Sequence, residues 1–468
     1  MTGAEATRPP DVRADIPPDL TGPPASEGGA PWMALLVLTM CFALAFTDRQ
    51  ILNLVVDHMK RDYLVSDKQI GFLLGPAFTI TYVSVGLFAG FCADRLNRRN
   101  LLVVAGLIWS LATFASALAP NFETMVATRM LVGASEAFLF PSGMSLVADL
   151  FDRRRLPLAT TIFLTAPYIG GGIALILGGI VIGQTEGMAP ISLSFGVMRD
   201  WQVAIALVGV LGAIPILSLL LLREPGRAEN AVAGEDLKTF GFWEGTIYMF
   251  KRWRFFIALF MAVSFNSVLL NTVPAWAPTM FIRQYGMDAQ GIGVIYGTMI
   301  LVLGIVAGLA SPAVNSIFAR NHADAPIRTT LIGPAILLAA GLGLVLAGSP
   351  TLALVCIAII TFGYVFPLPM AGTALQLASP PRLRGMASAY YFVIVSVIGV
   401  GIGPTLVPFT ADNLLRDADN LNTAIAIVTI VCAIVCFVFM RVALGGFRIE
   451  RGLAGKTAAS RNETGVIK

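Results

Sequence analysis

The sequence predicts an all-α polytopic membrane protein with twelve transmembrane helices arranged in two pseudo-symmetric halves. Its composition, its recurring apolar segments and an internal repeat all predict this fold. Of the 468 residues, 56% are hydrophobic and 13% are charged, whereas a soluble protein carries about 25% charged residues. Twelve spans of about 20 residues would use roughly 240 residues, so lipid is the expected solvent. A soluble enzyme, a nucleic-acid binder and a disordered chain are therefore excluded as main interpretations.

Long apolar segments recur along the chain after a polar beginning. A membrane β-strand needs only about 10 alternating residues, so segments of this length predict helices. The expected spans are 32–57, 68–92, 99–118, 122–150, 155–183, 200–222, 254–282, 288–318, 327–347, 350–379, 383–411 and 419–442.

The longest loop, over 223–253, divides the chain into an N-terminal bundle over 31–222 and a C-terminal bundle over 254–442. Residues 1–30 are polar and rich in proline, so a disordered cytoplasmic tail is expected there. A second cytoplasmic tail is expected over 443–468. No charged start followed by a short apolar core is visible, so no cleaved signal peptide is expected.

An internal repeat supports this division. The stretch from Pro141 to Ala159 aligns with the stretch from Pro369 to Ala387 at a constant offset of 228 residues. Each copy ends a long helix, crosses a short basic loop and starts a glycine-rich helix. Six-helix halves related in this way are typical of transporters whose binding site lies at the midplane between the halves.

The second part of the 223–253 loop is rich in aromatic and basic residues. Two interpretations stay open for it: a segment lying flat on the anionic inner leaflet, or an ordinary polar linker. The residues concerned are Phe240, Phe242, Trp243, Tyr248, Phe250, Lys251, Arg252 and Arg254.

Loop charges predict the orientation. If both termini lie inside, the cytoplasmic segments hold 24 of the 32 Lys and Arg residues, the other side holds 6, and 2 lie within spans. The positive-inside rule then places both termini in the cytoplasm of a multi-pass inner (plasma) membrane protein. The five cysteines fall in or beside apolar segments, which is not the pattern of a disulfide framework.

Four ionisable residues lie well inside spans: Asp48 and Arg49 in the first, and Arg129 and Glu136 in the fourth. Each costs about 2.5–3.5 kcal/mol at a helix centre, so lipid-facing positions are excluded. Arg129 and Glu136 share one helix face about 10.5 Å apart, while Asp48 and Arg49 diverge by about 100°. Cross-helix pairing of Arg49 with Glu136, or of Asp48 with Arg129, is expected.

These four residues predict proton or substrate handling, with an ion-pair staple between two helices as the alternative. Asp48 is the first choice for the proton carrier, assisted by Glu136 and Arg129. Arg49 and Arg129 cannot deprotonate and suit an anionic head group. Glu136 could be a second proton site or the partner of a substrate amine. No metal site is expected, and no cofactor besides a proton gradient.

The seventh span carries polar residues beside prolines. Asn266, Asn271 and Trp276 near Pro274 and Pro278 predict a broken helix with polar groups facing a cavity. Substrate contact and interhelical hydrogen bonding are both open for the two asparagines.

The loop between the second and third spans carries the most specific motif, built by Gly90, Asp94, Arg95, Arg98 and Arg99. It resembles the G-x-x-x-D-R-x-x-R-R signature of the major facilitator superfamily. Physically, the glycine allows close helix packing, while the charges can pair at a helix terminus.

The resemblance implies that this loop forms a cytoplasmic gate, with Asp149 as a partner at the end of the fourth span. The corresponding place in the second half carries Asn315 where the acidic residue would be. Only the first half is therefore expected to carry a strong ionic latch.

Five further stretches look like the spinster-type branch of the superfamily, over roughly 32–445. The resemblance implies that the four charged residues within spans line a central cavity. Spinster relatives in animals export sphingosine-1-phosphate or lysophospholipids, and this chain is similar to bacterial members. The stretches are Thr47–Arg49, Ala93–Arg99, Thr128–Ala137, Ala148–Phe151 and Ala275–Pro278.

The expected function is secondary active transport by alternating access, with proton coupling and a small amphipathic, lysolipid-like or sphingolipid-like substrate. A small organic anion is the alternative substrate. A lipid scramblase or channel without coupling is the alternative of a different class. An enzyme is not expected, since no nucleophile–base pair, metal cluster or phosphate loop lies at the midplane. Besides substrate and bilayer no partner is expected, least of all nucleic acid, and the chain should be a monomer.

Overall fold

The computed structural model describes residues 30–152, 155–193, 196–222, 224, 242–380 and 383–464. Within them, twelve helical stretches are long and apolar enough to cross a membrane. They coincide with the twelve predicted spans, which confirms the helix count and the fold class. The tail predicted over 1–30 and most of the loop predicted over 223–253 lie outside the described residues.

The first half is built by elements α1 to η3. Its helices are α1 (Ala30–Ile51), η2 (Leu52–Leu54), α2 (Val56–Tyr63), α3 (Asp67–Leu74), α4 (Pro76–Arg95), α5 (Arg98–Ser116), α6 (Phe122–Glu136), α7 (Leu139–Leu150), α8 (Leu156–Thr185), α9 (Gln202–Ser218) and η3 (Leu219–Leu221), and its strands are β1 (Ile191–Leu193) and β2 (Gly196–Met198).

The second half follows a linking helix, α10 (Phe242–Lys251). Its helices are α11 (Phe256–Tyr285), α12 (Ala289–Ala319), α13 (Ala325–Thr330), α14 (Ile332–Val345), α15 (Pro350–Val365), α16 (Leu368–Ala378), α17 (Arg384–Val395), η5 (Ser396–Ile402), α18 (Gly403–Phe409), η6 (Thr410–Leu415) and α19 (Leu421–Thr464).

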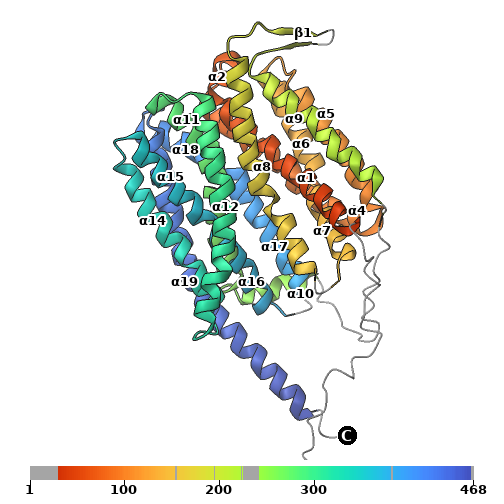
Figure 1. Ribbon diagram of the computed structural model, residues 1–468. Coiled ribbons are helices and arrows are strands. Elements are labelled where there is room, and N and C mark those ends of the chain that lie inside the picture. Colours follow the sequence, from red (N-terminus) through yellow and green to blue (C-terminus); the bar gives the residue numbers. More distant parts are fainter. Residues whose placement is uncertain are drawn as a thin grey trace, which may run out of the picture.

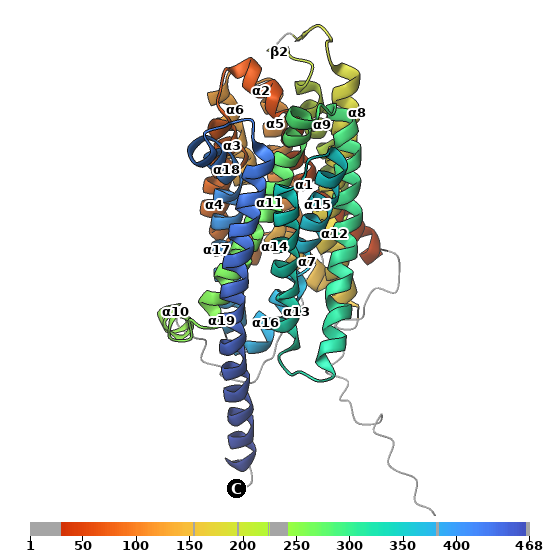
Figure 2. The same ribbon diagram turned by 90° about the vertical axis from the view of Figure 1, so that its left-hand side faces the viewer.

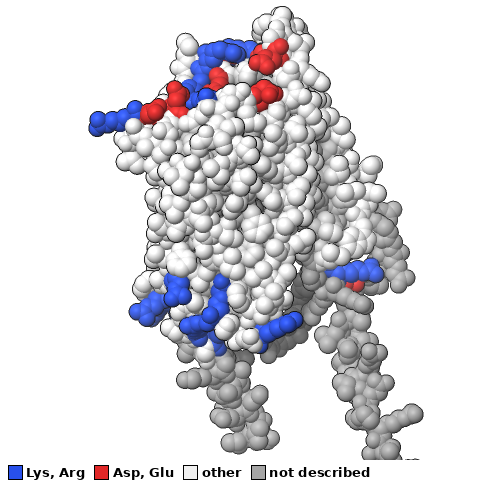
Figure 3. Space-filling view, turned by 60° about the vertical axis from the view of Figure 1, so that its left-hand side comes forward, with Lys and Arg blue, Asp and Glu red and all other residues white. Residues whose placement is uncertain are grey.

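The two halves stand side by side, and α8 of the first packs along α12 of the second (Figure 1). We call the end of the bundle where α1 begins and α19 ends the terminal face, and the end with α2 and the antiparallel β1–β2 hairpin the opposite face. Charged side chains gather at these two ends, and a broad belt between them shows none (Figure 3). This belt is the surface that a lipid bilayer would cover.

The predicted repeat has a structural counterpart. In the first half α7 spans Leu139–Leu150 and α8 begins at Leu156; in the second, α16 spans Leu368–Ala378 and α17 begins at Arg384. The first helix of each pair begins and ends, and the second helix begins, at an offset of 228 or 229 residues, which confirms the relation between the halves.

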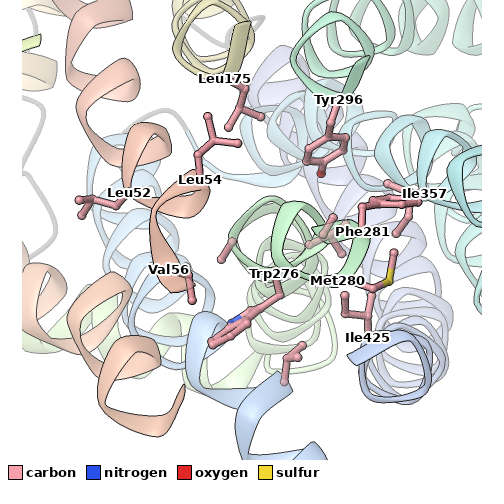
Figure 4. Packing of buried hydrophobic residues seen from close by; sticks show 14 of the residues in the cluster. Leu52, Leu54, Val56, Leu175, Trp276, Met280, Phe281, Tyr296, Ile357 and Ile425 are labelled. Atoms are coloured by element: carbon pink, nitrogen blue, oxygen red, sulfur yellow. The ribbon is translucent and has the colours of Figure 1, made fainter. Parts of the chain in front are cut away.

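Three hydrophobic clusters form the core. The largest joins both halves towards the opposite face, where Val56 of the first half lies near Trp276 of α11 (Figure 4). The buried members of the second cluster all belong to the first half, and those of the third belong to α10 and the second half. The halves thus share a core at the opposite face and keep separate cores near the terminal face.

Two predictions about helix shape are wrong. The seventh span is one continuous helix, α11, which contains both Pro274 and Pro278, because packing from neighbouring helices supports the groups that proline leaves unpaired. The last span does not end at 442, since α19 continues to Thr464. Phe447 is buried there against Phe255, 5.8 Å between ring centroids, so tertiary packing extends the helix.

Candidate functional site

The first buried ion pair joins α1 to α6. Arg129 donates from Nη1 and Nη2 to the two carboxylate oxygens of Asp48, at 2.7 and 3.0 Å. Both side chains are almost completely buried, with 3% and 0% exposed. A bidentate pair of this kind fixes both side chains, and removing one partner would leave a buried charge.

The second pair joins the same two helices. Arg49 donates to Oε2 of Glu136 from Nε at 2.9 Å and from Nη2 at 2.5 Å. The Glu136 side chain is 1% exposed, whereas that of Arg49 is 21% exposed. Both cross-helix pairs considered in the sequence are therefore present, and Arg49 is the member that remains accessible.

Helix geometry explains why two pairs form. Adjacent residues on α1 point about 100° apart, and residues seven apart on α6 lie on one face. Gly133, between the two α6 residues, allows α4 to approach, because a Cβ there would lie 2.4 Å from the Phe78 carbonyl oxygen. The two ion pairs between α1 and α6 thus lie at two different heights along these helices.

Aromatic rings surround the accessible arginine. The guanidinium carbon of Arg49 lies 4.2 Å from the ring centroid of Phe78, 4.9 Å from that of Phe46 and 5.2 Å from that of Tyr82. Cation–π attraction adds to the ion pair in such a setting. The result is a cation set in an apolar, aromatic wall.

This wall reaches the second half. Phe392 of α17 stacks on Phe140 of α7, with ring centroids 5.6 Å apart and planes inclined by 5°. The ring of Phe392 also lies 6.2 Å from that of Tyr82. The surroundings of Arg49 therefore include a helix of the other half, although all four charged residues of the site belong to the first.

Two buried polar atoms at this site have no hydrogen-bond partner: Oε1 of Glu136 and Nε of Arg129. Both oxygens of Asp48, in contrast, accept hydrogen bonds. A buried polar group without a partner is unfavourable, so Glu136 is the carboxylate with unused capacity to accept a proton or a donor.

The seventh-span residues lie apart from these pairs. Trp276 is buried and donates from Nε1 to the Pro404 carbonyl at 2.7 Å, and Asn266 donates to the Tyr364 carbonyl at 2.7 Å. Asn271 donates to the Ser267 carbonyl of its own helix at 2.8 Å. Of the two roles open for Asn266, substrate contact and interhelical hydrogen bonding, the structure thus shows the interhelical hydrogen bond. Trp276 lies in the hydrophobic core (Figure 4).

The motif between α4 and α5 contributes to a charge cluster at the terminal face. Arg98 is buried and pairs with Asp149 and with Glu224, the latter at 2.9 Å. Glu224 also accepts from the backbone N–H of Arg98 and of Arg99, at 3.2 and 2.8 Å. A carboxylate at this position stabilises the N-terminus of α5.

The other motif residues behave differently. Arg95 is exposed, and its guanidinium carbon lies 3.9 Å from the ring centroid of Phe91. A Cβ at Gly90 would meet nothing within 4 Å, so the expected close packing at this glycine is not found among the described residues. The side chain of Asp94 lies outside the described ones.

A latch at the opposite face was missed in the sequence. Arg283, at the end of α11, donates to Asp57 of α2 at 2.5 and 2.8 Å and to Asp67 of α3 at 2.9 Å. Lys68 of α3 adds an ion pair with Asp412 of η6 at 3.4 Å. These contacts cross between the halves and hold the opposite face closed.

In the sequence, the charges at the end of the seventh span resemble ordinary membrane-interface residues and so do not indicate a latch. The only signal was indirect: few basic residues fall on this side, and Arg283 and Lys68 are two of them.

Comparison with known proteins defines the class. The model of the Major Facilitator Superfamily matches residues 38–404, and the chain belongs to this superfamily of membrane transporters. Within it the chain is similar to spinster-type transporters. It is 24% identical over 291 residues to Protein spinster homolog 3 of Danio rerio (59% of this chain, 55% of that protein) and 27% identical over 219 residues to Protein spinster of Drosophila melanogaster (46% and 34%).

The chain spans about half or less of the length of these two relatives. An MFS-type efflux pump of Mycolicibacterium smegmatis is 24% identical over 410 residues, which is 86% of this chain and 89% of the pump. A crystal structure of a bacterial homologue of the human lysosomal transporter Spinster, inward-facing and unoccupied, superposes with a TM-score of 0.74 at 21% identity (91% of this chain, 98% of that chain). A D-xylose–proton symporter shares the fold with a TM-score of 0.66 at 15% identity, over 88% and 98% of the two chains.

Proposed function

We propose that this transporter moves a small anionic amphipath, of lysolipid or sphingolipid type, by alternating access coupled to protons. Arg49 carries the proposal, because it is a partly accessible cation in an aromatic wall and its buried partner Glu136 can be displaced. The guanidinium would hold the anionic head group, and the rings of Phe46, Phe78 and Tyr82 offer an apolar surface to the rest of the substrate.

Charge balance supplies the reason for coupling. Asp48, Arg49, Arg129 and Glu136 together carry no net charge when all are ionised. An anion bound at Arg49 leaves the Glu136 carboxylate without its counter-charge in a buried place, where an isolated charge is unfavourable. Uptake of one proton by Glu136 restores neutrality. Asp48, held by Arg129, is proposed as the second proton site and as the link between the two helices.

Alternating access requires the latch at Arg283 to open while the terminal face closes. We assign closure of the terminal face to Gly90, Asp94, Arg95, Arg98, Arg99 and Asp149. The open space beside Gly90 fits a state in which this face is not closed. We further propose that the termini are cytoplasmic, that the membrane is the inner or plasma membrane, and that the chain acts as a monomer.

Purified protein in liposomes tests the proposal. Uptake of labelled lysophospholipids, sphingosine phosphates and small organic anions is measured under imposed pH and voltage gradients. Glu136→Gln should abolish accumulation driven by a pH gradient and retain exchange of substrate between the two sides, whereas Arg49→Gln should lose both. Undiminished pH-driven accumulation by Glu136→Gln and by Asp48→Asn would contradict proton coupling.

The panel also separates the alternatives. Uptake of short organic anions in preference to amphipaths would favour the small-anion transporter. Lipid movement that does not saturate and ignores both gradients would favour a scramblase or channel.

A further inference from the structure

Helix α10 stands out sideways from the bundle at the terminal face, beside α19 (Figure 2). At about 100° per residue, its residues fall into three sectors. Gly245 and Met249 form one sector, Glu244 and Lys251 a second, and Trp243, Ile247 and Phe250 a third. Each sector meets a different environment.

The first sector docks on the second half. Met249 is buried, and a Cβ at Gly245 would lie 2.5 Å from the sulfur of Met386 of α17. Next to it, the hydroxyls of Thr246 and Tyr390 lie 2.8 Å apart. These contacts fix how α10 is rotated about its axis, so the direction of its other two sectors is determined.

The third sector is apolar and exposed. Trp243, Ile247 and Phe250 are 73%, 51% and 61% exposed, and Trp253, just after the helix, is also exposed. Phe256 begins the membrane-crossing helix α11 only five residues after the end of α10. At no more than about 3.6 Å per residue, this short connection holds α10 within the interfacial region of the bilayer.

Basic residues flank the apolar sector. Lys251 and Arg254 are exposed, while Arg252 pairs with Glu450 of α19 at 3.0 Å and packs on Tyr248. Exposed lysine and arginine beside interfacial aromatic residues suit an anionic lipid surface.

We propose that α10 lies in the lipid interface at the terminal face, with Trp243, Ile247 and Phe250 among the acyl chains and with Lys251 and Arg254 on anionic head groups. The occupant of this exposed sector is thus the bilayer. Helix α10 docks on α17, and α17 also carries Phe392, which lies beside the candidate site. The proposed lipid contact is therefore made by a helix that packs against a wall of this site.

Nitroxide labels on the full-length protein in nanodiscs test the location. The native cysteines are free and buried, and wild-type protein treated with the same nitroxide label measures their background. Ile247→Cys and the matched Lys251→Cys report on the apolar and basic sectors of the same helix. The ratio of accessibility to oxygen over accessibility to a water-soluble nickel chelate should be several-fold higher at 247 than at 251. Equal ratios at the two positions would overturn the proposal.

The lipid composition tests the head-group contact. Adding phosphatidylglycerol to phosphatidylcholine nanodiscs should raise the ratio at 247, and Lys251→Gln combined with Arg254→Gln should remove this increase while the ratio in pure phosphatidylcholine stays high. A ratio at 247 that does not respond to phosphatidylglycerol in the otherwise unaltered protein would overturn the anionic part of the proposal.

Discussion

The opposite face and the terminal face use similar ion pairs for different tasks. At the opposite face Arg283 and Lys68 join one half to the other, above a hydrophobic core that both halves share. The ion pairs described at the terminal face lie within a half, around Arg98 in the first and around Asp324 in the second. In the proposed alternating-access cycle an ion pair that crosses the halves must break, whereas one within a half can persist.

The largest effect is expected from breaking a cluster within a half. Arg98→Ala leaves Asp149 and Glu224 without their buried partner, which should lower the free energy of unfolding by about 3–5 kcal/mol. Thermal unfolding of the wild type and of Arg98→Ala in detergent measures this loss of stability. Because this cluster lies within one half, the loss of stability should occur whichever face is open, and an unchanged unfolding temperature would contradict the comparison.

A smaller but more specific effect is expected from the latch. The contacts of Arg283 with Asp57 and Asp67 exist only while the opposite face is closed, so Arg283→Ala destabilises that state alone. It should therefore favour opening by about 2 kcal/mol, between the values for buried and exposed pairs. Spin-label distances between Leu64→Cys and Leu414→Cys, both exposed at this face, should lengthen. Lys68→Ala is the matched weaker variant, and an unchanged distance distribution in Arg283→Ala would refute the latch.

The smallest effect is expected from acid at the terminal face. Burial alone would raise the pKa of Asp324, but hydrogen bonds from Arg328 and Arg448 outweigh it and hold this pKa below its usual value. The stabilisation is therefore present above the ordinary aspartate pKa of about 3.9 and is lost as pH falls through the lower, folded-state pKa.

Thermal unfolding of wild type and Asp324→Asn, compared across pH, measures this contribution. The difference between them should be constant at neutral pH and should vanish in strong acid. A difference that is the same at neutral pH and in strong acid would mean that the charge of Asp324 contributes nothing.

The comparison also shows what sequence can predict. Charges inside a span are conspicuous, because lipid excludes them, so Asp48, Arg49, Arg129 and Glu136 and their cross-helix pairing could be predicted. Arg283 and Glu224 lie at the ends of apolar segments, where charge is ordinary, and only the fold shows which of them meets a partner in the other half.

How the helices pack could not be predicted from the sequence either. Apolar length predicted the spans, but not that Trp276 would point at Pro404, that α11 would pass two prolines unbroken, or that α19 would continue past 442. These outcomes depend on neighbours far away in the chain. Gly90 is a further case, since the packing expected at this glycine is not found among the described residues.

The electrical neutrality of the four buried charges has a consequence for energetics. A site without net charge carries none across the membrane when the empty transporter reorients, so membrane voltage does no work on it in that step. If one monovalent anion and one proton enter together, the loaded site is neutral as well. Transport through this site would then follow the pH gradient and the substrate gradient and be indifferent to membrane potential.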